Sequence, residues 1–262
     1  MTPRSAEPVP RQTTFDPSSA AVPGREPVDC DVWWAAPVTV PAHRLALLDP
    51  AERQRYARHE ADGNHGARDR HATAAVLLRT LAARYTGCPA DRVRVDRTCP
   101  GCGQPHGKPR LPGLDLHVSL SHTDDLIAVA VTRAGPVGVD VERIDRGLDH
   151  RALARYALSD EETAWFRETE PVTGFYLVWT RKESILKATG DGLRVPMATL
   201  TLSAPGLPVR LLDATAHPGL PARARTTDLR PGPDHAAAVT VLADRPVRIR
   251  ESDVRADWLV RE

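Results

Sequence analysis

Apolar and polar positions along the chain predict helices and strands in two successive regions. Residues 29–40 predict a first strand, and residues 49–85 predict two helices separated by a break at 62–63. Asp49 followed by Pro50 is typical of a helix N-cap with proline at the first helical position. The apolar face of the second helix is expected to consist of Val76, Leu77, Leu78 and Leu81.

A loop rich in cysteine, glycine and proline at 94–110 precedes three short strands joined by turns. The strands are predicted at 117–121, 126–132 and 137–144. Residues 149–190 predict helices, and the chain from Thr199 onwards alternates short strands with Pro/Gly turns. This order predicts a mixed α+β fold in which the arrangement occurs twice, with a seam near Gly135.

The division into regions follows from this pattern and from composition. Residues 1–28 are rich in Pro, Ser, Thr and Ala without periodicity, and they predict a disordered tail. Residues 29–135 are expected to form an N-terminal lobe, and residues 136–262 a C-terminal lobe.

Composition narrows the classes of function. The chain has 262 residues, 41% of them hydrophobic and 5% aromatic, with a formal net charge of +1, which argues against a generic binder of polyanions. It has no apolar run of about 20 residues, as a membrane span needs. It also lacks the apolar core of a signal peptide, so we expect a cytoplasmic location. The four cysteines are too few for a disulfide scaffold and are expected to be free thiols or metal ligands.

Lysine is rare in this chain. Only three of the 35 basic residues are lysines, namely Lys108, Lys182 and Lys187. With abundant Ala, Arg and Pro, this usage resembles coding from a GC-rich genome, where arginine occupies ordinary surface positions. Because an ammonium and a guanidinium are not equivalent donors, the three lysines indicate positions where chemistry requires lysine. The alternative is chance survival.

Two carboxylates alternate with apolar residues in the segment GVDVERI at 138–144. On a strand, Asp140 and Glu142 face one way while Val139 and Val141 face the other. Carboxylates about 7 Å apart on a sheet face repel each other unless a cation or basic group lies between them. The alternative is an exposed polar strand face.

The segment WTRKESILKATG at 179–190 predicts a helix in which Glu183 and Lys187 lie one turn apart on one face. An ordinary pair at this spacing contributes only a few tenths of a kcal/mol. Together, Asp140, Glu142 and Glu183 could supply three oxygens to a hard cation such as Mg²⁺, leaving positions for water and phosphate. Lys187 would then neutralise a phosphate oxygen.

Two shorter motifs carry less information by themselves. Ser121 and His122 end a predicted strand, where their side chains either face a cleft or belong to a structural turn. Lys108 lies in a Pro-flanked loop, HGKPRLP.

Together the four motifs resemble those of the long, two-lobed 4′-phosphopantetheinyl transferases that activate peptide and polyketide synthases. That family combines a G-[IV]-D-[IV]-E strand with a W-[ST]-x-K-E-[AS]-hydrophobic-hydrophobic-K helix, which stand here as GVDVE at 138–142 and WTRKESILK at 179–187. Its Gly-Lys-Pro loop corresponds to residues 107–109, and its Ser-His motif to residues 121–122. The resemblance covers residues 45–245.

The resemblance implies roles for individual residues. Asp140, Glu142 and Glu183 match the metal ligands, and Lys187 and His122 match groups that contact the coenzyme A diphosphate.

It also implies a binding site for the nucleotide part of coenzyme A. The adenine side is expected to be contacted by the loop that contains Lys108 and Pro109, beside Ser121. The 3′-phosphate is expected to be contacted by Arg55 and Arg70. Arg53 and Arg79 are further candidates.

The fold implied by the resemblance is a pseudo-dimer of two similar α/β lobes in one chain, each a small sheet packed on a long helix. The active site would lie in the cleft between them. The implied reaction transfers phosphopantetheine from coenzyme A to a serine of an apo acyl or peptidyl carrier protein and releases 3′,5′-ADP. Mg²⁺, Lys187 and His122 would neutralise the diphosphate, and Glu183 is the candidate general base, directly or through a metal-bound water. We expect a monomer.

Two other functions would use some of the same residues. A metal-dependent phosphohydrolase would use the three carboxylates with water as nucleophile. A zinc-knuckle module that binds nucleic acid would use CPGCGQPH at 99–106, but the near-neutral charge and the few aromatic residues argue against it.

Cys99, Cys102 and His106 have the spacing C-x2-C-x3-H. They predict either a structural zinc site, with Cys88 or His117 as the fourth ligand, or a tight turn whose thiols are incidental.

The sequence does not identify the carrier protein. An apolar surface around Tyr156, Trp165 and Phe166 is expected to bind it, unless these side chains belong to the core.

Overall fold

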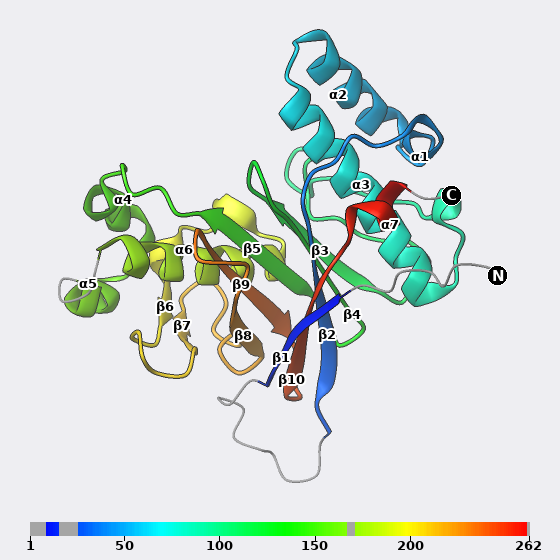
Figure 1. Ribbon diagram of the computed structural model, residues 1–262. Coiled ribbons are helices and arrows are strands. Elements are labelled where there is room, and N and C mark those ends of the chain that lie inside the picture. Colours follow the sequence, from blue (N-terminus) through cyan, green and yellow to red (C-terminus); the bar gives the residue numbers. More distant parts are fainter. Residues whose placement is uncertain (1–8, 16–25, 167–170, 261–262) are drawn as a thin grey trace.

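The computed structural model describes residues 9–15, 26–166 and 171–260 (Figure 1). Helices and strands are intermixed along the chain, which confirms the predicted α+β class. The helices are α1 (Ala42–Leu45), α2 (Pro50–Ala61), α3 (His65–Thr86), α4 (His150–Ala157), α5 (Asp160–Phe166), α6 (Pro171–Thr189) and α7 (Ala256–Val260), with 3-10 turns η1 (Ala90–Arg92), η2 (Gly192–Arg194) and η3 (Met197–Thr199). No helix in these described ranges has both the length and the apolar character needed to cross a membrane.

The first sheet contains five strands in the order β1-β10-β2-β4-β3. The strands are β1 (Val9–Phe15), β2 (Val28–Ala35), β3 (His117–His122), β4 (Ile127–Thr132) and β10 (Val247–Asp253). Helix α3 packs on this sheet, where Leu77, Leu78 and Leu81 join Val129 and Val131 in one buried cluster. All four residues predicted for the apolar face of α3 are buried.

Helices α2 and α3 lie where the sequence predicts two helices, whereas the short helix α1 was not predicted. Asp49 caps α2 in a capping box, in which its side chain accepts from the Glu52 N–H and the Glu52 side chain accepts from the Asp49 N–H. The predicted break follows at Gly63, whose φ of 66° is favourable for glycine.

The second sheet contains three antiparallel strands in the order β5-β9-β8. They are β5 (Val137–Arg143), β9 (His235–Leu242) and β8 (Ala224–Leu229), and a separate small sheet pairs β6 (Leu200–Leu202) with β7 (Leu211–Ala214). Helix α6 lies along the second sheet (Figure 1).

Gly138 sets the distance between β5 and α6. A Cβ atom on this residue would lie 2.0 Å from the Ser184 carbonyl oxygen and 2.4 Å from the Ala188 nitrogen. Any larger residue would therefore push the helix away from the strand. The glycine of GVDVE thus allows this strand motif and the helix motif WTRKESILK to pack closely against each other.

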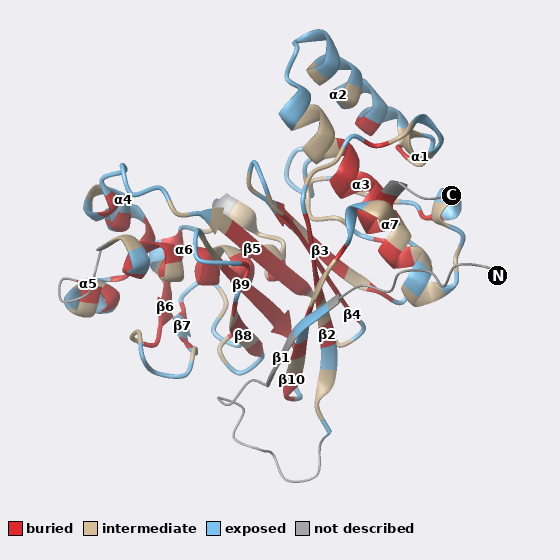
Figure 2. Ribbon diagram, in the orientation of Figure 1, coloured by how far each residue is buried: buried red, intermediate tan, exposed pale blue. Residues whose placement is uncertain are grey.

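The two sheets pack against each other through a buried cluster that includes Val32 from β2 and Val139 and Val141 from β5. Figure 2 shows that the strands on both sides of this contact are mostly buried. Because Val139 and Val141 face this core, the alternation of a strand turns Asp140 and Glu142 the other way, as predicted.

The ends of the chain differ from the predicted division. Val9–Phe15 forms β1, which pairs with β10, so the prediction of a disordered tail is wrong for this segment; its residues 1–8 and 16–25 lie outside the described residues. Strand β10 pairs in parallel with β2, so residues 247–253, predicted for the C-terminal lobe, belong to the first sheet. These pairings join opposite ends of the chain, which local sequence patterns cannot reveal.

A buried ion pair joins α5 to α6. Lys182 Nζ lies 2.5 Å from Glu162 Oε2, and both side chains are 0% exposed. Lys182 also donates to the carbonyl oxygens of Ala157 and Met197, and Glu162 accepts from the Leu202 N–H. Lysine at position 182 therefore has a structural role, because its ammonium satisfies a buried carboxylate and two buried carbonyl oxygens.

We expect Lys182→Met to lower the free energy of unfolding by about 3–5 kcal/mol, because it leaves the Glu162 carboxylate buried without a cation. Urea-induced unfolding measures this change. The double variant Lys182→Met/Glu162→Gln removes both charges and should recover much of the loss. Equal losses in the single and double variants would contradict the ion-pair explanation.

Candidate active site

Most of the predicted site residues meet where β3, β5 and α6 come together at the junction of the two sheets. These elements surround a cavity of about 340 Å³. The cavity is lined by Leu120, Ser121, His122, Asp140, Glu142, Trp179, Glu183 and Lys187. The structure therefore unites residues from three motifs that are separated along the sequence.

Lys187, Asp140 and Ser121 form a hydrogen-bonded triangle in this cavity. Lys187 Nζ lies 2.6 Å from Asp140 Oδ1 and 2.9 Å from Ser121 Oγ, and Ser121 Oγ donates to Asp140 Oδ1 at 3.0 Å. Asp140 is only 2% exposed, and its second oxygen, Oδ2, is buried without a hydrogen-bond partner among the described residues. An unsatisfied buried carboxylate oxygen is costly unless a cation or donor approaches it.

The other two carboxylates are also held in an environment that disfavours their charge. Burial, followed by the charge of Asp140, raises the pKa of Glu142 to about 7, although the Trp179 indole donates to it at 3.2 Å. Burial and the charge of Asp140 likewise raise the pKa of Glu183. Three carboxylates and one lysine in a single cavity leave an excess of negative charge.

The donor set fits a hard divalent cation, since it consists of carboxylate oxygens, one of them unsatisfied. The three carboxylates line one cavity, but in the described ranges their oxygen atoms do not all approach within 4.8 Å of one another. Lys187 donates a hydrogen bond to Asp140, and the Trp179 indole donates one to Glu142. A cation bound by all three would have to draw the carboxylates together.

His122, at the end of β3, is the polar group between this cavity and a second one. Desolvation, followed by the positive charges of Arg70 and Lys187, lowers the pKa of the His122 imidazole. The sequence predicted a group that neutralises phosphate charge. The structure favours a neutral imidazole, which can donate one hydrogen bond to a phosphate oxygen.

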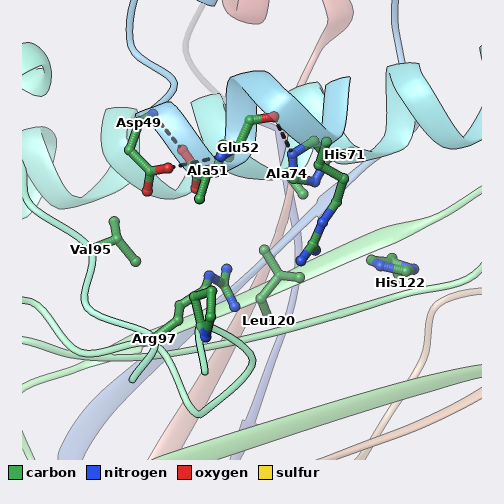
Figure 3. Close-up of a pocket in the computed structure, with 12 residues that line it drawn as sticks. Asp49, Ala51, Glu52, His71, Ala74, Val95, Arg97, Leu120 and His122 are labelled. Carbon is green, nitrogen blue, oxygen red and sulfur yellow. Dashed lines mark hydrogen bonds between the residues drawn. The ribbon is translucent and has the colours of Figure 1, made fainter. Parts of the chain in front are cut away.

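The second cavity, of about 140 Å³, lies between α2, α3 and the loop that follows η1. Figure 3 shows Glu52 and His71 on its helical wall, with Arg97 and Leu120 on the opposite side. Arg55 and Arg97 both line it, and neither forms an ion pair within the part of the chain that the structure describes. Burial lowers the pKa of the Arg97 guanidinium, a penalty that a bound anion would relieve.

The four arginines predicted from the sequence to be candidates for binding the 3′-phosphate have different environments in the structure. Arg55 lines the second cavity, whereas Arg70 pairs with Asp124 at 2.7 Å. Arg79 is 2% exposed and pairs with Glu52 at 2.8 Å, so its position is structural. Arg53 donates to the Leu48 carbonyl oxygen.

Sequence reasoning missed Arg97 and His71. Arg97 lies within the cysteine loop at 94–110 but outside any recognised motif. A single sequence gives no signal that would select it from the other arginines.

Lys108 ties its loop to the second sheet. Its ammonium donates to the carbonyl oxygens of Val137, at 2.9 Å, and Ala188, at 2.6 Å. Pro109 and Lys108 line a third cavity, of about 680 Å³, together with Glu183 and Lys187. The predicted contact of this loop with adenine stays a prediction, but the Lys108 ammonium is already engaged by backbone.

The three cavities share lining residues, so they adjoin one another. Leu120 lines all three, His122 the first two, and Glu183 and Lys187 the first and the third. A long ligand could therefore extend past the carboxylates in both directions.

We expect the free energy of unfolding of the metal-free protein to fall as the pH rises from about 4.5 to about 7, the usual and the raised pKa of Glu142. In this window the folded state keeps a proton that the unfolded state has released, so stability is lost as the pH rises through the folded pKa. Thermal unfolding in the presence of a chelator measures the slope, and Glu142→Gln should reduce it. An identical slope in that variant would rule out Glu142 as its source.

Comparison with known proteins points to the same segment. Residues 136–239 match the family model of the 4′-phosphopantetheinyl transferase superfamily. The chain is 34% identical over 95 residues to the 4′-phosphopantetheinyl transferase gsp of Aneurinibacillus migulanus, a match that covers 35% of this chain and 38% of that protein. It is 29% identical over 129 residues to a 4′-phosphopantetheinyl transferase of Bacillus subtilis, covering 48% of this chain and 54% of that protein.

A longer match is to the 4′-phosphopantetheinyl transferase Sfp of Bacillus subtilis (strain 168), with 26% identity over 164 residues, 60% of this chain and 67% of that protein. The chain thus spans between about a third and two thirds of the length of these relatives. The matches confirm the resemblance predicted from the motifs.

Proposed function

We propose that this protein transfers the 4′-phosphopantetheine group of coenzyme A to a serine of an apo carrier protein and releases 3′,5′-ADP. The observation that carries the proposal is the meeting of Asp140, Glu142, Glu183 and Lys187 in one cavity between the sheets. All four lie within the segment that matches the transferase family. The relatives whose names state this activity support the same assignment.

We assign Asp140, Glu142 and Glu183 as the residues that would hold Mg²⁺. Bound there, Mg²⁺ would offset the charge of a diphosphate and of the leaving ADP. Lys187 would exchange its contact with Asp140 for a diphosphate oxygen, and a neutral His122 would donate a further hydrogen bond.

The transfer forms a bond between the serine oxygen and the β-phosphorus of coenzyme A. The bond from that phosphorus to the bridging oxygen of 3′,5′-ADP breaks, and the electron pair leaves with ADP. Glu183 is our candidate for the group that accepts the serine proton. It lines both the carboxylate cavity and the largest of the three cavities.

The nucleotide end of coenzyme A has a separate candidate subsite. Arg55, His71 and Arg97 line the second cavity, together with Asp49 and Glu52, and would bind the 3′-phosphate by charge-assisted hydrogen bonds. The loop of Lys108 and Pro109 would contact adenine on the other side of the groove, with Lys108 fixing the position of the loop. The two sheets, each packed on a long helix, support the predicted pair of α/β lobes with the site between them.

The surface expected to bind the carrier is smaller than predicted. Phe166 is 4% exposed and belongs to the core, and Trp165 packs against that core, so the core interpretation holds for both. Tyr156 is 79% exposed, beside Leu153 on the same helix. We therefore assign the apolar part of the carrier contact to Tyr156 and Leu153. The monomeric state and the cytoplasmic location stay predictions.

The proposal is tested by incubating the purified protein with coenzyme A, Mg²⁺ and a panel of apo acyl and peptidyl carrier proteins. Mass spectrometry should show a carrier that has gained one phosphopantetheine, together with 3′,5′-ADP. Free phosphopantetheine with an unmodified carrier would identify a phosphohydrolase instead. No reaction with any carrier in the panel would contradict both activities.

A further inference from the structure

The cysteine loop forms a second cluster of metal-ligand type, which the proposed transfer does not use. One donor atom from each of Cys99, Cys102 and His106 lies within 4.8 Å of the others, and Cys102 Sγ lies 2.9 Å from His106 Nε2. Zinc bonded at about 2.3 Å to sulfur and about 2.0 Å to nitrogen, with tetrahedral angles, would hold such donors about 3.5–3.8 Å apart. Small side-chain movements are enough to reach that geometry.

Hydrogen bonds within the loop backbone bring the donors together. The Cys99 N–H donates to the Gln104 carbonyl oxygen at 2.9 Å, and the Gly103 N–H donates to the Cys99 carbonyl oxygen at 2.8 Å. Gly103 has a φ of 74°, which favours glycine in this turn. A Cβ on Gly107 would lie 2.9 Å from the Thr98 carbonyl oxygen, so the loop closes tightly after His106.

Zinc binds cysteine as the thiolate, so each cysteine of the cluster would bring one negative charge to the ion. A Cβ on Gly101 would lie 3.8 Å from the Cys99 sulfur and 3.4 Å from the Arg194 guanidinium, so both groups lie against this turn of the loop. Two thiolates with one divalent cation would also leave the cluster electrically neutral.

The fourth ligands predicted from the sequence are not brought to this cluster. Neither Cys88 nor His117 joins the three donors, nor does any other His, Cys, Asp or Glu side chain that the structure describes. Cys99 and His106 line the largest cavity, so one side of the cluster is open to solvent.

We propose that Cys99, Cys102 and His106 bind one zinc ion, with a water molecule in the fourth position. Two sulfurs and an imidazole select zinc over the hard cation expected at the carboxylates. The ion is separate from the transfer chemistry. It stiffens the loop whose Lys108 bridges Val137 and Ala188, and so it holds one wall of the groove in place.

Metal analysis tests this directly on the full chain, expressed without added zinc and purified without metal-affinity resin or chelator. We expect about one zinc per chain in the unaltered protein. In Cys99→Ser and in His106→Gln the zinc content should be lower by a factor of about five or more. Cys88→Ser removes a half-buried thiol outside the cluster and serves as the matched control, with zinc retained. Less than about 0.2 zinc per chain, or iron or copper in its place, would overturn the proposal.

A second measurement does not depend on the folding of variants. The unaltered protein, stripped of metal under reducing conditions, is titrated with zinc against a chromogenic chelator. One-to-one binding, with increased hydrogen-exchange protection of residues 97–110, supports the site. Failure to compete, or a Cys99–Cys102 disulfide in freshly purified protein, would overturn it. Neither readout requires transferase activity, so the zinc site and the proposed function can fail independently.

Discussion

Glu183→Gln is expected to lower kcat/KM for phosphopantetheine transfer at least about 1000-fold, or about 4 kcal/mol of transition-state stabilisation. The change keeps the shape of the side chain but removes a carboxylate that is proposed both to hold Mg²⁺ and to accept the serine proton. The fold should survive, because burial and Asp140 already raise the pKa of Glu183 and disfavour its charge. The melting temperature of the metal-free variant should therefore equal or exceed that of the wild type.

The matched control is Glu161→Gln, which removes an exposed carboxylate on α5, away from the cavity. Its transfer rate should equal that of the wild type. Asp140→Asn and Glu142→Gln should lose activity as Glu183→Gln does. Near-normal turnover of Glu183→Gln at millimolar Mg²⁺ would refute the assignment of this residue.

Lys187→Arg is expected to lower the rate of transfer at least about tenfold, or about 1.4 kcal/mol, although it keeps the positive charge. The lysine ammonium is a compact donor that lies within 3 Å of both Asp140 and Ser121. A guanidinium is planar and larger, and it cannot place its charge at the same point beside a carboxylate that is only 2% exposed. Single-turnover kinetics at saturating coenzyme A separate this effect from weaker binding.

Arg92→Lys is the control for this substitution, because Arg92 is exposed on η1, outside the three cavities. It should leave transfer unchanged. If Lys187→Arg were as active as this control, catalysis would not require a lysine at position 187.

The predicted site residues that the structure brings into one cavity lie within contiguous motifs. Alternation along a strand was enough to place Asp140 and Glu142 on one face, and the helical repeat was enough to place Glu183 above Lys187. Arg97 and His71 of the second cavity could not be found this way. Arg97 becomes a candidate only because the loop that carries it folds back against α2 and α3.

The rare lysines illustrate the same limit. The sequence singled out Lys108, Lys182 and Lys187 as positions that require lysine, but not the reason for each. Lys182 forms a buried ion pair with Glu162, and Lys108 donates to two carbonyl oxygens. Of the three, only Lys187 lies in the cavity lined by Asp140, Glu142 and Glu183.

Local patterns by themselves determined the helices from α2 to α6, most of the strands, the apolar face of α3 and the four motifs, because these depend on neighbours a few residues away. The tertiary structure decided which of these elements meet. It brought β10 beside β2 and β1 beside β10, which moved the end of the chain into the first sheet. It also let α6 approach β5 at Gly138, and so joined the carboxylates of two motifs in one cavity. Such contacts depend on how buried faces fit together, and one sequence does not display that.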